Sequence, residues 1–124
     1  MDVVNNRILS PEGDGIFLHT GGEGLPEIRN VRIRGNTISN VGRHGIFATG
    51  QGVAVERNEI RDCRKAGIYV GDNVTVAENR IINASPGILI EGTRDRAVRG
   101  NSTRNAPIRV LGGDRSGISG NIEE

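Results

Sequence analysis

Residues 53–60 read V-A-V-E-R-N-E-I, and residues 74–81 repeat the same pattern as V-T-V-A-E-N-R-I. Each stretch is followed by a glycine, an isoleucine, a variable residue and an apolar residue, at 67–70 (G-I-Y-V) and 87–90 (G-I-L-I). Apolar residues alternate with period two in these segments, which indicates short strands and not helices. A repeat of roughly 20 residues predicts a solenoid whose coils stack on one another.

The same asparagine recurs on both sides of this stretch, at Asn6, Asn36, Asn58, Asn79, Asn101 and Asn121. An apolar residue stands three positions before each of them. Stacked coils place equivalent residues about 4.8 Å apart, so amide side chains in one column can bond from coil to coil. We therefore expect an interior structural ladder formed by Asn36, Asn58, Asn79 and Asn101.

Charged residues support the same stacking, because like charges directly opposite each other would repel. Three pairs of opposite charge share a phase on neighbouring coils: Arg34 with Glu56, Arg57 with Glu78, and Glu59 with Arg80. A second polar column follows four residues after the asparagines and consists of Ser10, Asn40, Asp62, Asn83 and Asn105.

The pattern V-x-V-x-x-N-x-I followed by G-I-x-V resembles the repeat of pectate-lyase-like proteins, and the resemblance covers essentially the whole chain. We therefore expect residues 1–124 to form a single all-β domain, a right-handed parallel β-helix of about five coils of 20–22 residues, with three short strands per coil. That superfamily includes polysaccharide lyases, glycoside hydrolases and alginate epimerases. The resemblance implies a carbohydrate bias, but a fold alone does not define a reaction.

The chain departs from catalytic members of that family in two respects, because it has fewer coils and no readable capping helix. Two interpretations remain open: the chain is a fragment of a longer β-helix, or its open strand edges meet other chains. The sequence shows no signal-peptide pattern. An extracellular or surface location is implied by the resemblance alone.

Composition argues against several classes of function. Sixteen Lys and Arg oppose 15 Asp and Glu, with no long run of one sign, so we expect no nucleic-acid partner. No apolar stretch reaches the length of a membrane span, so we expect no membrane insertion. Cys63 is the single cysteine, and a small apolar column predicts its burial. No spacing of His, Cys and carboxylates predicts a metal site, and no cofactor is expected.

The three aromatic residues share one column with two others: Phe17, Phe47, Tyr69, Leu89 and Arg109. The residues directly before and after them in each strand are mostly apolar and are expected to point into the core, so this column should point outward. An outward apolar stripe favours an interface between copies of the chain, which predicts a homo-oligomer. A flat aromatic row could instead stack sugar rings. Both interpretations stay open.

Polar residues gather beside this strand, where Asp14 and His44 share one column and Arg43 and Lys65 share the preceding one. A carboxylate, an imidazole and two cations can carry out acid–base chemistry on a uronic acid. The alternative is that these are solvated turn residues with an incidental Asp14–His44 ion pair.

The first coil is longer than its successors, with an insertion at residues 21–27 that follows His19. Such a loop either binds a ligand or covers the first coil. The favoured function is a non-catalytic β-helical module that self-associates and presents a surface to polysaccharide. The alternative is a small or truncated polysaccharide lyase or epimerase that acts on a uronic-acid polymer, with Asp14, His44, Arg43 and Lys65 as candidate catalytic residues.

Overall fold

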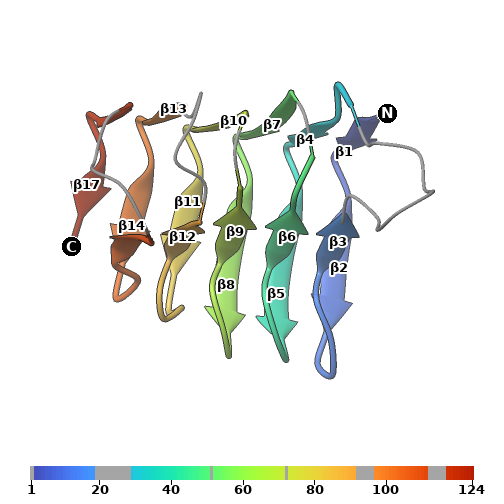
Figure 1. Ribbon diagram of the computed structural model, residues 1–124. Coiled ribbons are helices and arrows are strands. Elements are labelled where there is room, and N and C mark those ends of the chain that lie inside the picture. The colour runs from blue at the N-terminus through green and yellow to red at the C-terminus, as the bar shows by residue number, and fades with distance from the viewer. Residues whose placement is uncertain (1, 19–28, 51, 72, 92–96, 112–116) are drawn as a thin grey trace.

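The computed structural model shows a solenoid in which β-strands of successive coils lie side by side (Figure 1). It describes residues 2–18, 29–50, 52–71, 73–91, 97–111 and 117–124. The insertion at 21–27 and His19 lie outside the described residues. Five successive triplets of strands, from β1–β3 to β13–β15, are followed by the pair β16 and β17. The N- and C-termini lie at opposite ends of the stack.

Three parallel sheets run along the solenoid, and each coil contributes one strand to each sheet. The first sheet contains β1 (Asp2–Val4), β4 (Arg32–Arg34), β7 (Val53–Glu56), β10 (Val74–Ala77), β13 (Ala97–Arg99) and β16 (Ile118–Ser119). The second contains β2 (Arg7–Ser10), β5 (Thr37–Val41), β8 (Glu59–Cys63), β11 (Arg80–Ile82), β14 (Ser102–Arg104) and β17 (Ile122–Glu123). The third contains β3 (Ile16–Leu18), β6 (Ile46–Ala48), β9 (Ile68–Val70), β12 (Ile88–Ile90) and β15 (Ile108–Val110). The predicted three-strand coil is confirmed.

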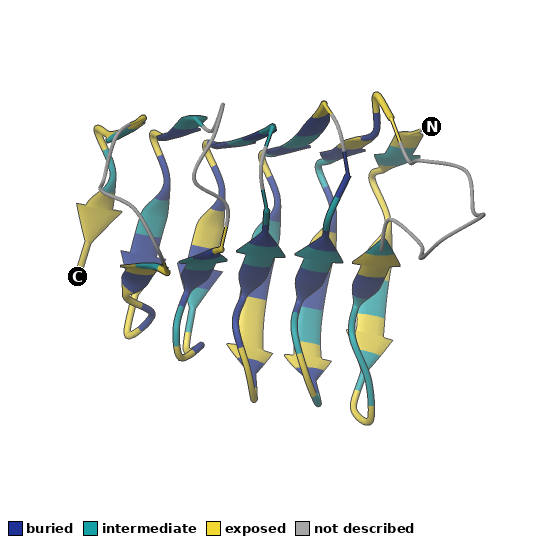
Figure 2. Cartoon of the chain, in the orientation of Figure 1, coloured by how far each residue is buried: buried dark blue, intermediate teal, exposed yellow. Residues whose placement is uncertain are grey.

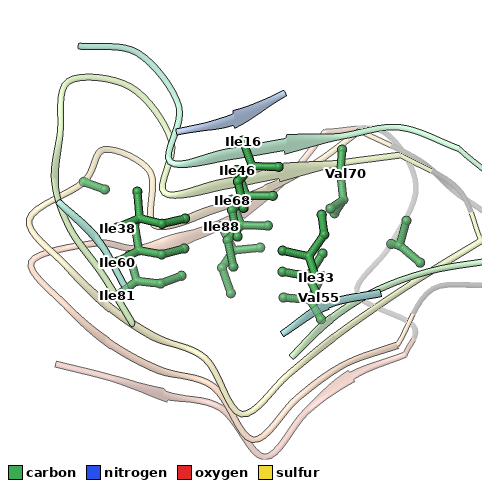
Figure 3. Close-up of a cluster of buried hydrophobic side chains, with 14 of the residues drawn as sticks. Ile16, Ile33, Ile38, Ile46, Val55, Ile60, Ile68, Val70, Ile81 and Ile88 are labelled. Carbon is green, nitrogen blue, oxygen red and sulfur yellow. The ribbon is translucent and has the colours of Figure 1, made fainter. Parts of the chain in front are cut away.

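The core consists of apolar columns that run parallel to the axis, one or two from each sheet (Figure 3). Figure 3 shows Ile38, Ile60 and Ile81 stacked in one such column, with Ile33 and Val55 stacked in another. Branched side chains suit these columns because each packs on the equivalent residue of the next coil. Figure 2 shows the resulting alternation, in which buried and more exposed residues follow one another along the strands.

Each coil turns at single residues in the left-handed backbone region, where φ is positive. One corner column immediately precedes the ladder asparagines and contains Asn5, Gly35, Arg57, Glu78, Gly100 and Gly120. One of the others contains Asn40, Asp62, Asn83 and Asn105, and another contains Asn30, Gly52 and Asn73. Glycine, asparagine and aspartate tolerate this conformation best. Arg57 and Glu78 adopt it at φ 54° and 57°, which costs free energy.

The second polar column of the sequence therefore lies at a corner of the coil, where Asn40, Asp62 and Asn83 are exposed. Its amides still link coils: Asn83 Nδ2 donates to Asp62 Oδ1 at 3.0 Å. Ser10 does not share the column, because the β2–β5 register shifts after Leu9 and pairs Ser10 with Val41. The left-handed Asn40 accounts for the extra residue.

The charge pairs meet in the expected register. Arg34 pairs with Glu56, and Glu59 with Arg80, on neighbouring strands. Arg57 Nε lies 2.8 Å from Glu78 Oε2, and both side chains are more than half exposed. Glu59 also accepts from Arg61 at 2.6 Å within its own strand. Exposed pairs of this kind contribute little to stability and serve mainly to fix the register.

Candidate functional site

The ladder asparagines lie in one continuous column. Each amide oxygen accepts two bonds from the preceding coil: Asn58 Oδ1 accepts from Asn36 N at 2.9 Å and from Asn36 Nδ2 at 3.0 Å. The amide nitrogen of Asn58 donates to Asn79 Oδ1 at 3.0 Å and to the carbonyl oxygen of Ile33 at 3.1 Å. The same pattern recurs from coil to coil, and the side chains of Asn36, Asn58, Asn79 and Asn101 are buried. These polar groups therefore satisfy one another inside the solenoid.

We define the aromatic strip as the outward column of the third sheet, formed by Phe17, Phe47, Tyr69, Leu89 and Arg109. The Phe17 and Phe47 rings are stacked, with centroids 4.9 Å apart and planes at 17°. The Phe47 and Tyr69 rings are stacked at 4.5 Å and 4°. Phe17 is 59% exposed. The structure thus brings the predicted residues together on one face.

The rings of the strip cover one another's faces, because they stack along the solenoid axis. A sugar-stacking platform needs ring faces turned toward solvent, and this column presents ring edges instead. Sequence periodicity placed the rings in one column but could not give their tilt. The stacked geometry weakens the interpretation of the strip as a flat platform for sugar rings.

Asp14 and His44 lie on adjacent coils, as their shared column predicts, but their contact differs from an ion pair. Asp14 Oδ1 accepts a hydrogen bond from the backbone amide of His44 at 2.8 Å. His44 in turn accepts at Nδ1 from the backbone amide of Ala66 at 3.2 Å. The two side chains therefore occupy equivalent roles, each serving as acceptor for the backbone of the next coil.

Arg43 and Lys65 are exposed on adjacent coils beside this column. Their backbones continue the stack, with the amide of Lys65 donating to the carbonyl oxygen of Arg43 at 3.1 Å. Partial burial lowers the pKa of His44, and the positive charges of Lys65 and Arg43 lower it further, while Asp14 opposes the shift. These effects together favour the neutral form of the imidazole.

The chemistry open to this cluster is restricted by its hydrogen bonds. A general base needs a free lone pair that reaches the proton it removes. The Nδ1 lone pair of His44 already accepts from Ala66, and one of the two carboxylate oxygens of Asp14, Oδ1, already accepts from the backbone of His44. Among the described residues, no group of three or more His, Cys, Asp and Glu side chains is placed to hold a metal ion.

Cys63 is buried on the second sheet, and burial raises the pKa of its thiol to about 11. The thiol is therefore protonated at neutral pH and is a weak nucleophile.

Two further polar residues were not singled out from the sequence. Thr103 is buried in the column that elsewhere holds Ile38, Ile60 and Ile81, and its Oγ1 has no hydrogen-bond partner among the described residues. Glu123 pairs in register with Thr103, and its Oε1 accepts from the backbone amide of Ile108 at 2.7 Å. Both interrupt an otherwise apolar column, and that interruption was a readable signal.

Comparison with known families agrees with this architecture, since the family model described as "Right handed beta helix region" matches residues 1–122. The chain belongs to the right-handed β-helix family. No curated protein and no solved structure matches the chain significantly. In the part of the chain that the structure describes, no helix is long and apolar enough to cross a membrane.

Proposed function

We propose that this right-handed β-helix is a non-catalytic module that associates with a second copy of itself through the aromatic strip. The observation that carries the proposal is the column of apolar side chains on the outer face of the third sheet, where Phe17 is 59% exposed. Contiguous apolar side chains on a solvated sheet face are typical of interfaces between proteins.

The order of residues along the strip is suited to a second copy in the opposite direction. A two-fold axis through Tyr69 would place Phe47 against Leu89 of the other copy and Phe17 against its Arg109. The aliphatic stem of Arg109 would then pack against the aromatic end of the strip. Two-fold contacts of this kind close on themselves and yield a dimer, not a filament. A strip one side chain wide buries less than a standard interface, so the dimer should be weak.

The polar cluster beside the strip supports a non-catalytic role. Asp14 and His44 are the residues best suited to acid–base chemistry, and both accept hydrogen bonds from the backbone of the following coil. Their polar atoms are explained by the stacking of the coils. For His44 to act as the base of a lyase or epimerase on a uronic-acid polymer, it would have to give up its bond to Ala66.

Sedimentation equilibrium across a wide concentration range tests the self-association. The wild-type chain should exceed its 13.3 kDa monomer mass at high concentration, and Phe17→Lys should remain monomeric. Leu9→Lys is the matched control, because Leu9 is 65% exposed in the same coil but lies on the second sheet. A wild-type protein that stays monomeric, or a Leu9→Lys variant that dissociates equally, would refute the proposal.

A second proposal, that the same face presents a surface to polysaccharide, is supported by the exposed cations Arg43 and Lys65 at the border of the strip. Cations recognise the carboxylates of uronic acids. Oligogalacturonate should then shift the amide resonances of Arg43 and Lys65, and Lys65→Glu should abolish the shift. Absence of any shift would exclude this surface. Release of unsaturated ends, seen by ultraviolet absorbance and lost in His44→Ala, would show instead that the cluster is catalytic.

A further inference from the structure

His44 connects three consecutive coils through two hydrogen bonds at the turn that leads into the third sheet. Its backbone amide donates to Asp14 in the preceding coil at 2.8 Å, and its Nδ1 accepts from the amide of Ala66 in the following coil at 3.2 Å. A ring nitrogen accepts only when it carries no proton, so the proton of the neutral imidazole resides on Nε2.

The composition of the column formed by Asp14, His44, Ala66 and Pro86 explains why an acceptor is needed here. Each residue of the column precedes the glycine of the third sheet, and its carbonyl accepts from the glycine of the coil before: His44 from Gly15, Ala66 from Gly45 and Pro86 from Gly67. The amides of His44 and Ala66 bind side-chain acceptors. Ala66 offers no acceptor to the next coil, but Pro86 has no amide hydrogen to satisfy.

We propose that His44 is a proton-sensitive latch between the second and third coils, which holds the Ala66 amide when neutral and releases it when protonated. A proton from solvent would bind the Nδ1 lone pair. Nδ1–H would then face the amide hydrogen of Ala66, so two donors would oppose each other and that amide would lose its acceptor. This regulation lies within one chain and does not depend on self-association.

The charged groups around the ring define the direction of the pH dependence. Asp14 faces it from the preceding coil, Lys65 from the following coil and Arg43 from its own coil. Burial and the two cations lower the pKa of His44 in the folded chain below its ordinary value of 6.5. The folded state then binds fewer protons than the unfolded state. The stability from this group is fully present above pH 6.5 and is lost as the pH falls through the folded-state pKa.

The latch adjoins the aromatic strip, so its release should be visible there. The His44 ring lies 5.6 Å from the Phe47 ring and 5.5 Å from the Tyr69 ring, between centroids, and is tilted by about 40° to each. The chain contains one tyrosine and no tryptophan, so Tyr69 alone supplies its intrinsic fluorescence in the near ultraviolet. Protonation of the adjacent imidazole should change that signal.

Hydrogen exchange at Ala66, corrected for the intrinsic pH dependence of exchange, tests the latch on dilute monomeric protein. The protection factor should fall at least tenfold between pH 7.5 and the pH at which the His44 imidazole is protonated, together with the change in Tyr69 fluorescence. His44→Asn should remove both effects, because the Asn oxygen can accept at the position of Nδ1 but does not titrate. His19→Asn, which changes the other histidine, should behave like the wild type.

Constant protection of Ala66 in the wild type, or a fall that persists in His44→Asn, would overturn the proposal. If His44→Asn does not fold, the wild type alone gives a second test by nuclear magnetic resonance. The Ala66 amide resonance must then titrate with the same midpoint as the His44 imidazole, and a different midpoint would overturn the latch. If His44→Asn loses the pH sensitivity of Ala66 but still dimerises, the latch and the proposed self-association are independent properties.

Discussion

Replacement of Asn58 by alanine tests whether the amide ladder holds the coils together. The change would leave two buried donors without their acceptor, the backbone amide of Asn36 and one of its Nδ2 hydrogens, and it would remove one donor from the carbonyl oxygen of Ile33. Each orphaned buried group costs about 1–3 kcal/mol. At the lower limit the two orphaned donors sum to about 2 kcal/mol, a substantial part of the stability of about 5–15 kcal/mol that is typical of a domain.

Urea denaturation followed by far-ultraviolet circular dichroism measures this loss. We expect a lower midpoint with an unchanged slope, since the surface exposed on unfolding is nearly the same. Asn6→Ala is the matched control, because Asn6 is exposed and its side chain donates one bond, to Asn36 Oδ1 at 3.0 Å. It should cost about 1 kcal/mol or less. An Asn58→Ala variant that loses no more stability than Asn6→Ala would refute the ladder as a source of stability.

Two further substitutions test the packing of the columns by the same urea assay. Thr103→Val should stabilise the chain by about 1–2 kcal/mol, since it removes a buried hydroxyl without a partner, and no gain would contradict the orphaned Oγ1. Gly45→Ala should destabilise it by about 1–3 kcal/mol, because an added Cβ would lie 2.6 Å from the carbonyl oxygen of Gly67. Gly71→Ala, whose Cβ would meet nothing closer than 3.9 Å, is its control, and equal losses in the two variants would show that close packing is not the cause.

The columns of this fold were predictable because stacking brings each residue into contact with the equivalent residue of the next coil, about one repeat away in the sequence. Once the asparagines are aligned, Asn58 must neighbour Asn36 and Asn79, and no choice of topology remains. The same alignment gives the apolar columns and the register of the charge pairs. Each position in the repeat has a single possible neighbour in the next coil, so the sequence was sufficient to predict these columns and pairs.

The corners were less readable because a residue's own preference can be overridden by its column. Arginine and glutamate rarely adopt positive φ, so neither Arg57 nor Glu78 alone indicates a turn. Their column also contains Asn5, Gly35 and Gly100, which do. The backbone of the stack imposes one conformation on every coil, so the column predicts the corner where the single residue does not.

Ring orientation was beyond the sequence for a different reason. Phe17, Phe47 and Tyr69 were assigned to one outward column, but side-chain torsions decide whether such rings turn their faces to solvent or to each other. With centroids about 4.5–5 Å apart, matching the strand spacing, the rings stack face to face and turn those faces toward one another. The choice between a sugar platform and an interface depends on that torsion, which no periodicity encodes.

The pairing of Asp14 with His44 shows that a correctly predicted neighbourhood can also have a purely structural explanation. A carboxylate beside an imidazole first suggests an ion pair or a catalytic dyad, and the alignment gave their adjacency correctly. The column continues with Ala66 and Pro86, however, and this order follows from the backbone alone: an acceptor must stand wherever the next coil carries an amide hydrogen there. Asp14 accepts from the backbone amide of His44, His44 accepts from that of Ala66, and Pro86 has no amide hydrogen that needs an acceptor. That requirement explains the two side chains more fully than catalysis does, and it makes the protonation state of His44 a structural variable.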